Sequence, residues 1–354
     1  MPANPLPNPL PSPLPSPLND PLILAAPPDI AVPPLRDALF AHWSLAGTLH
    51  LLGGERDRNF RLDQDGAEPL LVKLAHPDEP PAITHFQTAA LLHLEGAAPS
   101  LPVPRILRAG GGATAIPHPA RDGRPCLLRV LTYLPGVPMT AAAGPARARA
   151  LGSLAARLNR ALEGFSHPAE TRRLVWDLRE ASRLRAFLPD VGDPALRALA
   201  EAALDRFEGQ AAPVLAALPG GVIHNDLNPH NVLVDPGDPA RLTGLIDFGD
   251  MLRAPRLQEV ATACAYLLSP EGDPFAGPRA FLAGYRAVLP LAEEEAALLP
   301  ALIATRMAMT VLIVAWRSRL QPENAAYIRR NLPRAGAGLE TLARLSAERM
   351  GAEE

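Results

Sequence analysis

The segment of residues 224–250 constrains the fold of this chain more than any other, because it combines two short apolar runs with fixed polar positions. It reads H-N-D-L-N-P-H-N-V-L-V and, after a turn, L-T-G-L-I-D-F-G-D. Residues 232–234 and 242–246 are strand-like apolar runs, and the turn-forming sequence D-P-G-D lies between them. The pattern predicts a short hairpin whose polar flanking residues lie close together.

Three of these flanking residues are Asp226 and Asn231 at the start of the hairpin and Asp247 at its end. Phosphoryl transfer from a magnesium nucleotide needs a carboxylate that accepts the proton of the attacking hydroxyl, and hard oxygen ligands for the metal. Loops favour Asp, Asn and Gly in general, but turn chemistry does not predict H-x-D-x-x-x-x-N followed by D-F-G. We therefore predict that Asp226 is the catalytic base and that Asn231 and Asp247 are the metal ligands.

A second and independent signal is the only lysine among the 34 basic residues, Lys73. It lies in the apolar run P-L-L-V-K-L-A, where an unpaired charge would be costly. Arginine-rich coding bias could leave one lysine by chance. A compact ammonium on a flexible stem, however, binds nucleotide phosphates as a point charge. Position and residue type together predict that Lys73 contacts phosphates.

A glycine pair, Gly53 and Gly54, lies between two apolar stretches about twenty residues before this lysine. Backbone amides can approach phosphates closely where side chains are absent. Any hairpin can carry two glycines, so the signal gains weight mainly from its place ahead of Lys73.

The chain resembles the aminoglycoside phosphotransferase and choline kinase superfamily, relatives of the protein kinases. Within it, the chain is most similar to the hydroxylysine kinase group, including the kinase-like domains that some proteins fuse to a class III aminotransferase. The resemblance runs from about residue 35 to about residue 330 and is more specific in the second half. The segments that carry it are G-E-R-D-R-N-F at residues 54–60, V-K at 72–73, V-I-H-N-D at 222–226, Asn228, N-V-L-V at 231–234 and G-L-I-D-F-G-D-M at 244–251.

This resemblance implies an α+β fold of the two-lobed protein-kinase type, with a small five-stranded antiparallel N-lobe and a larger, mostly helical C-lobe. It implies ATP or GTP as the phosphoryl donor, bound with Mg²⁺ in the cleft, and a small-molecule hydroxyl acceptor. Asp226 would be the base, and Asn231 and Asp247 would be the metal ligands. The residues that would contact the nucleotide are Lys73, Gly53, Gly54, Asn59, Gln87 and Tyr133.

The chain departs from the superfamily pattern at one position. Superfamily members commonly pair the strand lysine with a glutamate on the following helix, and Gln87 holds the matching place here. A neutral amide can hydrogen-bond an ammonium group but adds no charge. Three partners for Lys73 therefore stay open, namely Gln87, Glu95 or the phosphates themselves.

Proline content and periodicity predict three parts of the chain. Residues 1–34 hold 13 of the 42 prolines and should form an extended or disordered tail. Residues 35–136 should form the N-lobe, with five strands and a helix near residues 82–95, ending in a hinge at residues 131–136, which include Tyr133. Residues 137–354 should form the C-lobe. Apolar residues at helical spacing predict its helices at residues 147–165, 194–218, 257–268, 292–319 and 324–344.

Charge, cysteine content and hydropathy exclude several classes of protein. A net charge of −3 with interspersed signs gives no electrostatic case for nucleic acid. Cys126 and Cys264 lie in apolar runs and are expected to be buried small side chains, without a disulfide or metal role. The strongest apolar stretch, residues 308–316, is too short to cross a membrane. With no charged leader before Arg36, we expect a cytoplasmic protein; its oligomeric state stays open.

The acceptor is less constrained, because its pocket is expected among the helices after the D-F-G sequence. An amino-acid acceptor would need an arginine for its carboxylate and a carboxylate for its ammonium group. A polycationic aminoglycoside would favour an acidic pocket, and the run E-E-E at residues 293–295 is expected instead at a helix start. We predict a kinase of a small, hydroxylated, amine-bearing metabolite, hydroxylysine- or homoserine-like; the alternatives are an aminoglycoside kinase and a non-catalytic nucleotide-binding regulator. The candidate acceptor residues are Asp250, Glu259, Arg306, Trp316 and Arg317.

Overall fold

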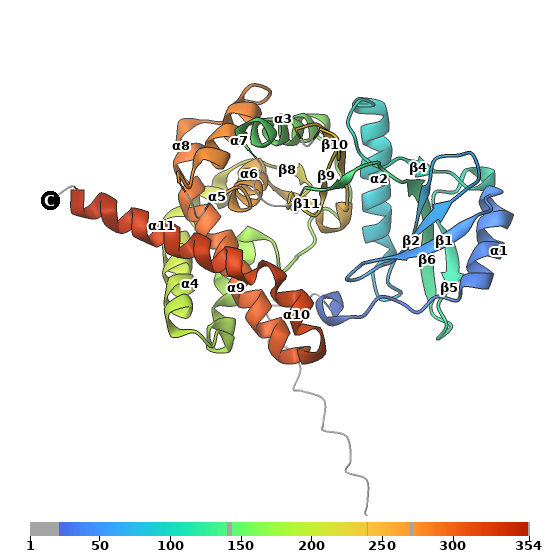
Figure 1. Cartoon of the computed structure of the whole chain (residues 1–354), viewed down its shortest axis with the longest axis horizontal. Coiled ribbons are helices and arrows are strands. Elements are labelled where there is room, and N and C mark those ends of the chain that lie inside the picture. Colours follow the sequence, from blue (N-terminus) through green and yellow to red (C-terminus); the bar gives the residue numbers. More distant parts are fainter. Residues whose placement is uncertain (1–20, 140–143, 239, 270–271, 353–354) are drawn as a thin grey trace, which may run out of the picture.

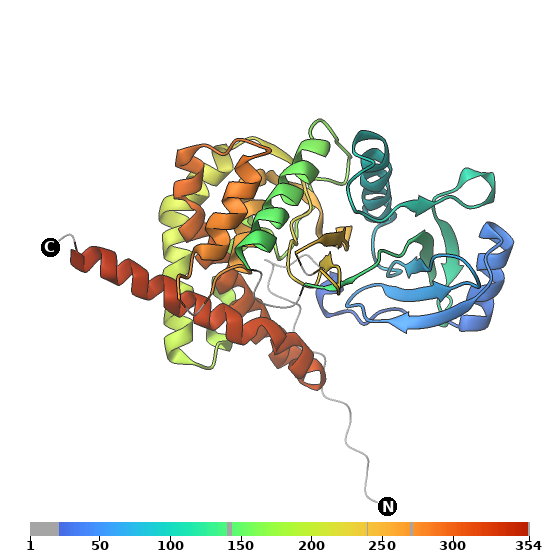
Figure 2. The same ribbon diagram turned by 45° about the horizontal axis from the view of Figure 1, so that its top comes forward.

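The computed structural model describes residues 21–139, 144–238, 240–269 and 272–352. These residues form two lobes, a strand-rich N-lobe and a larger, mostly helical C-lobe (Figure 1). The N-lobe sheet is antiparallel throughout, and helix α2 lies between this sheet and the C-lobe in both views (Figures 1 and 2). The prediction of a two-lobed, kinase-like α+β fold is confirmed.

The N-lobe sheet has six strands where five were expected. Its order is β1-β2-β3-β6-β4, and β5 pairs with β6 as well. The long strand β6 accommodates two short partners, because Ile106 of β4 pairs with Leu131 and Ile116 of β5 pairs with Leu128. The strands are β1 Thr48–Leu52, β2 Arg58–Asp63, β3 Leu70–Leu74, β4 Ile106–Leu107, β5 Ile116–Pro119 and β6 Pro125–Thr132.

Strand β3 alternates between the lobe core and the cleft. Leu70, Val72 and Leu74 are buried in the core of the N-lobe. Because successive side chains of a strand point to opposite faces, Leu71 and Lys73 face the other side, where both line the cleft. The strand predicted around Lys73 is thus confirmed, and the alternation of side chains along it is enough to direct the Lys73 ammonium group toward the cleft.

Two helices complete the N-lobe, α1 (Val32–Trp43) and α2 (Pro81–Ala97). Helix α2 agrees with the predicted helix. Helix α1 was missed, because its first turn contains Pro33 and Pro34 and these were assigned to the tail. Proline is compatible with a first helical turn, where the backbone N–H has no intrahelical partner.

The expectation of a proline-rich tail up to residue 34 is wrong from residue 21 onward. Leu22, Ile23 and Ile30 are buried, Ile23 against the C-lobe core and Ile30 in the N-lobe core. The Gln321 side-chain amide donates to the Leu24 carbonyl at 3.1 Å. This short segment therefore contacts both lobes. Residues 1–20 of the predicted tail lie outside the described residues.

The predicted catalytic hairpin is present in the C-lobe. Strands β9 (Val232–Val234) and β10 (Leu242–Leu245) pair antiparallel, and β7 (Val137–Pro138) adds a third strand. A two-stranded ribbon of β8 (Gly220–Ile223) and β11 (Leu252–Pro255) lies beyond the two ends of the catalytic segment. The chain enters the catalytic loop from β8 and leaves the D-F-G sequence into β11.

The helices of the C-lobe follow the predictions with several differences. The helix predicted at residues 194–218 contains a π-helical turn at Phe207–Ala211, and the one predicted at 292–319 is divided just before Pro300. Helix α7 and the 3₁₀ segment Leu178–Asp190 were not predicted. The helices are α3 Pro145–Ala161, α4 Pro194–Arg206, α5 Ala212–Ala217, α6 Arg256–Ala265, α7 Ala276–Arg286, α8 Glu293–Ala297, α9 Leu299–Leu320, α10 Ala325–Ile328 and α11 Leu332–Ala352.

Helix α9 forms the centre of the C-lobe core. Among the described residues it is the one helix long and apolar enough to cross a membrane, and 89% of its most apolar window is buried inside the protein. The helix is longer than the apolar stretch of residues 308–316 that stands out in the sequence, because polar residues such as Arg306 and Thr310 are buried within it. The buried side chains of α9 thus serve as protein core.

Both cysteines are buried and unpaired, as expected. Burial raises the pKa of the Cys126 thiol to about 11 and raises that of Cys264 as well. Burial thus disfavours the thiolate form of both side chains.

Candidate active site

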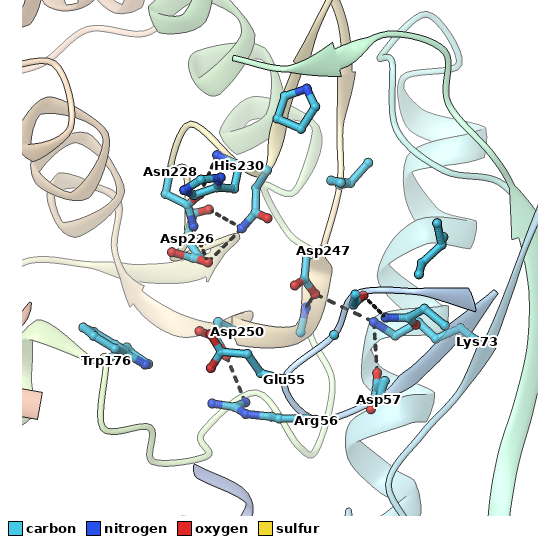
Figure 3. A pocket seen from close by; sticks show the side chains of 18 of the residues that line it. Glu55, Arg56, Asp57, Lys73, Trp176, Asp226, Asn228, His230, Asp247 and Asp250 are labelled. Carbon is cyan, nitrogen blue, oxygen red and sulfur yellow. Dashed lines mark hydrogen bonds and ion pairs between the residues drawn. The ribbon is translucent and has the colours of Figure 1, made fainter. Parts of the chain in front are cut away.

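A cavity of about 580 Å³ lies between the two lobes. It is lined from the N-lobe by the glycine turn and β3, and from the C-lobe by the catalytic hairpin, α9 and the segment that follows α9. Figure 3 shows Asp226, Asp247 and Lys73 pointing into this space from different elements. All nine residues predicted as catalytic, nucleotide-contacting or metal-binding line it: Gly53, Gly54, Asn59, Lys73, Gln87, Tyr133, Asp226, Asn231 and Asp247.

The Asp226 carboxylate is held by three side chains. Oδ2 accepts hydrogen bonds from the Asn228 and Asn231 amides, both at 2.8 Å. Oδ1 accepts from Arg306 of α9 at 3.3 Å. The side-chain orientation is therefore fixed, and the contact with Arg306 links the catalytic loop to the central helix of the C-lobe.

Burial raises the pKa of Asp226 to about 6, and the negative charge of Asp250 acts in the same direction. The Arg306 guanidinium opposes both effects. A carboxylate with a raised pKa is a stronger proton acceptor than a solvated one, which suits a general base.

The polypeptide behind Asp226 is buried and hydrogen-bonded. His224 is fully buried, its Nε2 lies 3.0 Å from the Ile246 carbonyl, and its Nδ1 accepts from the Asp226 N–H at 3.3 Å. Asn225 adopts a left-handed conformation with φ of 68°, and its N–H donates to Glu259 of α6 at 3.0 Å. These contacts fix the loop from behind and leave Asp226 facing the cavity.

The two predicted metal ligands present oxygen atoms to the same cavity. Asn231 uses its Nδ2 to donate to Asp226, which leaves the amide oxygen available for a ligand. Asp247 adopts a left-handed conformation with φ of 62°, and its Oδ1 accepts from the Gly249 N–H at 3.3 Å. An amide oxygen and a carboxylate form the hard donor set that Mg²⁺ prefers. The residues present thus fit the metal that the sequence motif implies.

Lys73 pairs with a carboxylate that the sequence reasoning missed. Its Nζ lies 2.9 Å from Oδ2 of Asp57 and 3.8 Å from Oδ1 of Asp247 (Figure 3). Burial alone would lower the pKa of Lys73, but these two carboxylates outweigh it and raise the pKa. Lys73 is therefore a charged ammonium group directed at the cavity.

Neither Gln87 nor Glu95 is the partner of Lys73. The Gln87 Oε1 accepts from Nη2 of the buried Arg129 at 2.9 Å. Glu95 is exposed near the end of α2. Gln87 lines the cavity, but its hydrogen-bonding capacity toward a cation is used by Arg129 on the neighbouring strand β6.

The glycine turn joins β1 to β2, and one of its glycines is required by space. A Cβ on Gly54 would lie 2.5 Å from the Asp57 carbonyl oxygen and 2.8 Å from Nδ2 of Asn59. A Cβ on Gly53 would contact nothing within 4 Å. Asn59 donates to the Gly53 carbonyl at 3.3 Å and so holds the turn from within.

The segment predicted as the hinge follows β6, which ends at Thr132, and Tyr133 lines the cavity. The Tyr133 N–H donates to the Pro69 carbonyl at 3.3 Å. This N–H is therefore already hydrogen-bonded within the N-lobe. Three residues further on, Gly136 has φ of 117°, and a Cβ there would lie 2.3 Å from the Thr243 hydroxyl, so the chain can pass this point only as glycine.

Two of the five acceptor candidates are wrong. Glu259 is fully buried behind the catalytic loop, where it accepts from the Asn225 N–H. Trp316 stacks on Phe187 with ring centroids 4.8 Å apart inside the C-lobe core. Neither side chain lines the cavity, whereas Asp250, Arg306 and Arg317 do. Helical spacing alone could not separate the cavity face of α9 from its core face, because nearly all of the helix is buried.

Further cavity residues were missed because their partners lie far away in the sequence. Glu55 accepts from Arg317 and from Arg330, each at 3.0 Å. Arg56 donates to Asp250 at 3.1 Å. Both contacts cross the cleft from the glycine turn to the C-lobe. The only sequence signal for them is the dense charge of the segment G-E-R-D-R-N-F itself.

The fold and this cavity define a kinase-like phosphotransferase, and comparison with known proteins agrees. A family model described as the phosphotransferase enzyme family matches residues 48–299, which include every residue of the predicted catalytic and nucleotide site. The chain belongs to this family.

Individual relatives are kinases of small hydroxylated molecules. The chain is 27% identical to hydroxylysine kinase of Bos taurus over 295 residues, which cover 77% of this chain and 78% of the relative. It is 30% identical to homoserine kinase of Azorhizobium caulinodans over 292 residues, which cover 80% and 86%. The solved structure of a microcompartment-associated aminopropanol kinase superposes with a TM-score of 0.69 at 21% identity, over 90% of this chain and 98% of that one.

Proposed function

We propose that this protein transfers the γ-phosphoryl group of a magnesium nucleotide, ATP or GTP, to the hydroxyl of a small amine-bearing metabolite that resembles hydroxylysine or homoserine. The observation that carries the proposal is the convergence of Asp226, Asn231, Asp247 and Lys73 on one cavity between the lobes. The curated relatives named above act on hydroxylated amino acids, which supports this acceptor class.

Each residue would have a separate task. Lys73 and the backbone of the glycine turn would hold the nucleotide phosphates, and Asn231 and Asp247 would hold Mg²⁺, which supplies charge neutralisation on those phosphates when bound. Asp226 would accept the proton of the acceptor hydroxyl. At the same time the hydroxyl oxygen would bond to the γ-phosphorus, and the bond from this phosphorus to the leaving nucleoside diphosphate would break. The products are a phosphate monoester and the diphosphate.

The acceptor part of the cavity carries both signs of charge. Arg306, Arg317 and Arg330 line it together with Asp250 and Glu55. An acceptor that bears both a carboxylate and an amine could be recognised by such a mixed set. The acidic run at residues 293–295 is outside the cavity; it forms the first turn of α8, where Glu295 accepts from the Ala292 N–H at 3.0 Å. This placement weakens the case for a polycationic aminoglycoside.

The test is an acceptor panel with purified protein, Mg²⁺ and either ATP or GTP. The panel contains hydroxylysine, homoserine, choline, ethanolamine and representative aminoglycosides, and the readout is the phosphorylated product by mass spectrometry. We expect metal-dependent product with a hydroxylated amino acid. Product from an aminoglycoside alone would reassign the acceptor, and nucleotide binding with no transfer to any acceptor would favour a regulatory role.

A further inference from the structure

The partner of Lys73 lies on the glycine turn, and the helix that faces this lysine makes a different contact. The Asp57 carboxylate is 2.9 Å from the Lys73 ammonium, and both side chains are largely buried, with 11% and 15% of their surface exposed. The second Asp57 oxygen accepts from the His76 N–H at 3.3 Å, which fixes the carboxylate in place. The ion pair is therefore short and sheltered from solvent, and the Asp57 carboxylate is fixed by a second contact.

A neighbouring cation makes this carboxylate necessary. Lys73 of β3 lies directly opposite Arg129 of β6 in the antiparallel register, and Arg129 is 1% exposed. Two buried like charges on adjacent strands repel each other. The Asp57 carboxylate attracts both cations and so offsets this repulsion. Without Asp57, Lys73 would lose its nearest anion while it kept a buried cation as its neighbour.

Helix α2 hydrogen-bonds Arg129 and not Lys73. Gln87 accepts from Nη2 of Arg129 at 2.9 Å, and the Thr88 hydroxyl accepts from Nη1 at 3.3 Å. The other carboxylate near Lys73 within the described part of the chain is Asp247, whose side chain is 54% exposed and 3.8 Å away. Asp57 is thus the better-placed of the two anions.

We propose that Asp57 is the positioning residue for Lys73, so that the turn that covers the nucleotide phosphates also aims the lysine at them. This inference rests on the proposed function, because it assigns Lys73 to the phosphates. The glycine turn and Lys73 would then move together, and a shift of α2 would reach Lys73 only through Arg129.

The experiment is a double-mutant cycle on magnesium-nucleotide affinity, measured by titration calorimetry on the full chain. The variants are Asp57→Asn, Lys73→Met and the pair, with Asp63→Asn on β2 as the matched carboxylate control. We expect each single variant to weaken binding by about 10- to 100-fold, and the double variant to be no weaker than the weaker single one. Losses that multiply in the double variant would mean that the two residues act independently and would overturn the proposal.

Two further variants keep the test valid if Asp57→Asn is unstable, since breaking a buried ion pair is destabilising. Asp57→Glu retains the charge and should bind nucleotide within about 5-fold of the wild type; binding as weak as that of Lys73→Met would contradict a positioning role for this carboxylate. Adding Gln87→Glu to Asp57→Asn should not restore affinity, because residue 87 faces Arg129. Restoration would show that α2 can hold the lysine.

A split in the kinetic constants separates positioning from a purely structural role. In Asp57→Asn the kcat/KM for nucleotide should fall while the KM for the acceptor stays within about 3-fold. A lower melting temperature with unchanged kinetic constants would overturn the proposal. A wild-type protein that binds no magnesium nucleotide would refute the proposed function together with this inference, whereas normal binding by both wild type and Asp57→Asn would refute this inference alone.

Discussion

Glu55 of the glycine turn and Arg317 of α9 form an ion pair across the cleft, with 3.0 Å between Oε2 and Nη1. Arg330 contacts the other oxygen of the same carboxylate at 3.0 Å. The turn is thereby fastened to the C-lobe over the cavity. Burial would raise the pKa of Glu55, but the two arginines outweigh it and hold the pKa below its ordinary value.

Glu55→Gln should loosen the glycine turn without unfolding the protein. Because the pKa of Glu55 is lowered in the folded state, the ion pairs stabilise the protein fully at pH values above the ordinary glutamate pKa. This stabilisation is lost as the pH falls through the lower folded-state pKa. We expect faster amide hydrogen exchange at residues 53–58 at neutral pH, and a KM for nucleotide raised by about 2- to 5-fold. The exposed Glu68→Gln is the control, and equal exchange in both variants would refute the fastening role.

The buried segment ahead of α1 predicts a cost for N-terminal truncation. Removing residues 1–34 deletes Leu22, Ile23 and Ile30, and burial of an aliphatic side chain stabilises by about 1.5–3 kcal/mol. The free energy of unfolding should fall by roughly 3 kcal/mol or more, measured by urea denaturation. The variant lacking only residues 1–20 keeps these three residues, and equal stability of the two truncated proteins would show that the segment contributes nothing.

The solitary lysine allows a chemical test of the N-lobe. An amine-reactive ATP analogue can attack Lys73 and the terminal amine alone, because the chain has no other lysine. Labelling should map to residues 70–75 and be suppressed by excess magnesium nucleotide. Lys73→Arg should lose activity by at least about 10-fold, since a planar guanidinium does not fit a site shaped for a compact ammonium group. Labelling that ignores nucleotide, with a fully active arginine variant, would contradict the assignment.

The proposed metal ligand Asp247 should respond differently from the proposed base. Asp247→Asn removes one oxygen anion of the donor set and one of the two carboxylates near Lys73. We expect both magnesium-nucleotide affinity and kcat to fall, each by about 10-fold or more. A titration of activity with Mg²⁺ should show a higher half-saturating concentration. An unchanged Mg²⁺ requirement would place the metal elsewhere.

The catalytic hairpin was predictable because its chemistry is local. Asp226, Asn231 and Asp247 lie within 22 residues of each other, and two short strands joined by a turn bring them together. Residue types and spacing carry the information there. The strand that holds Lys73 was predictable for the same reason, since a single charge in an apolar run must face away from the core.

The partners of these residues were not predictable from spacing. Arg306 reaches Asp226 from 80 positions away, and Arg317 reaches Glu55 from 262 positions away. Helix α9 is buried almost all round, so its periodicity does not show that Arg306 faces the cavity while Trp316 faces the core. Gln87 was a candidate partner for Lys73 because of its place in the chain. The register of β3 against β6 instead puts Arg129 beside Lys73, and Gln87 hydrogen-bonds Arg129.

Single-turnover phosphoryl transfer by Asp226→Asn tests whether Asp226 accepts the proton of the acceptor hydroxyl. The substitution keeps the shape of the side chain and removes its basicity. We predict that the transfer rate falls by about 10²- to 10⁴-fold while magnesium-nucleotide affinity stays within about 3-fold of the wild type. Asp238→Asn, in the turn of the same hairpin, is the control. A near-normal transfer rate in Asp226→Asn would show that Asp226 is not the base.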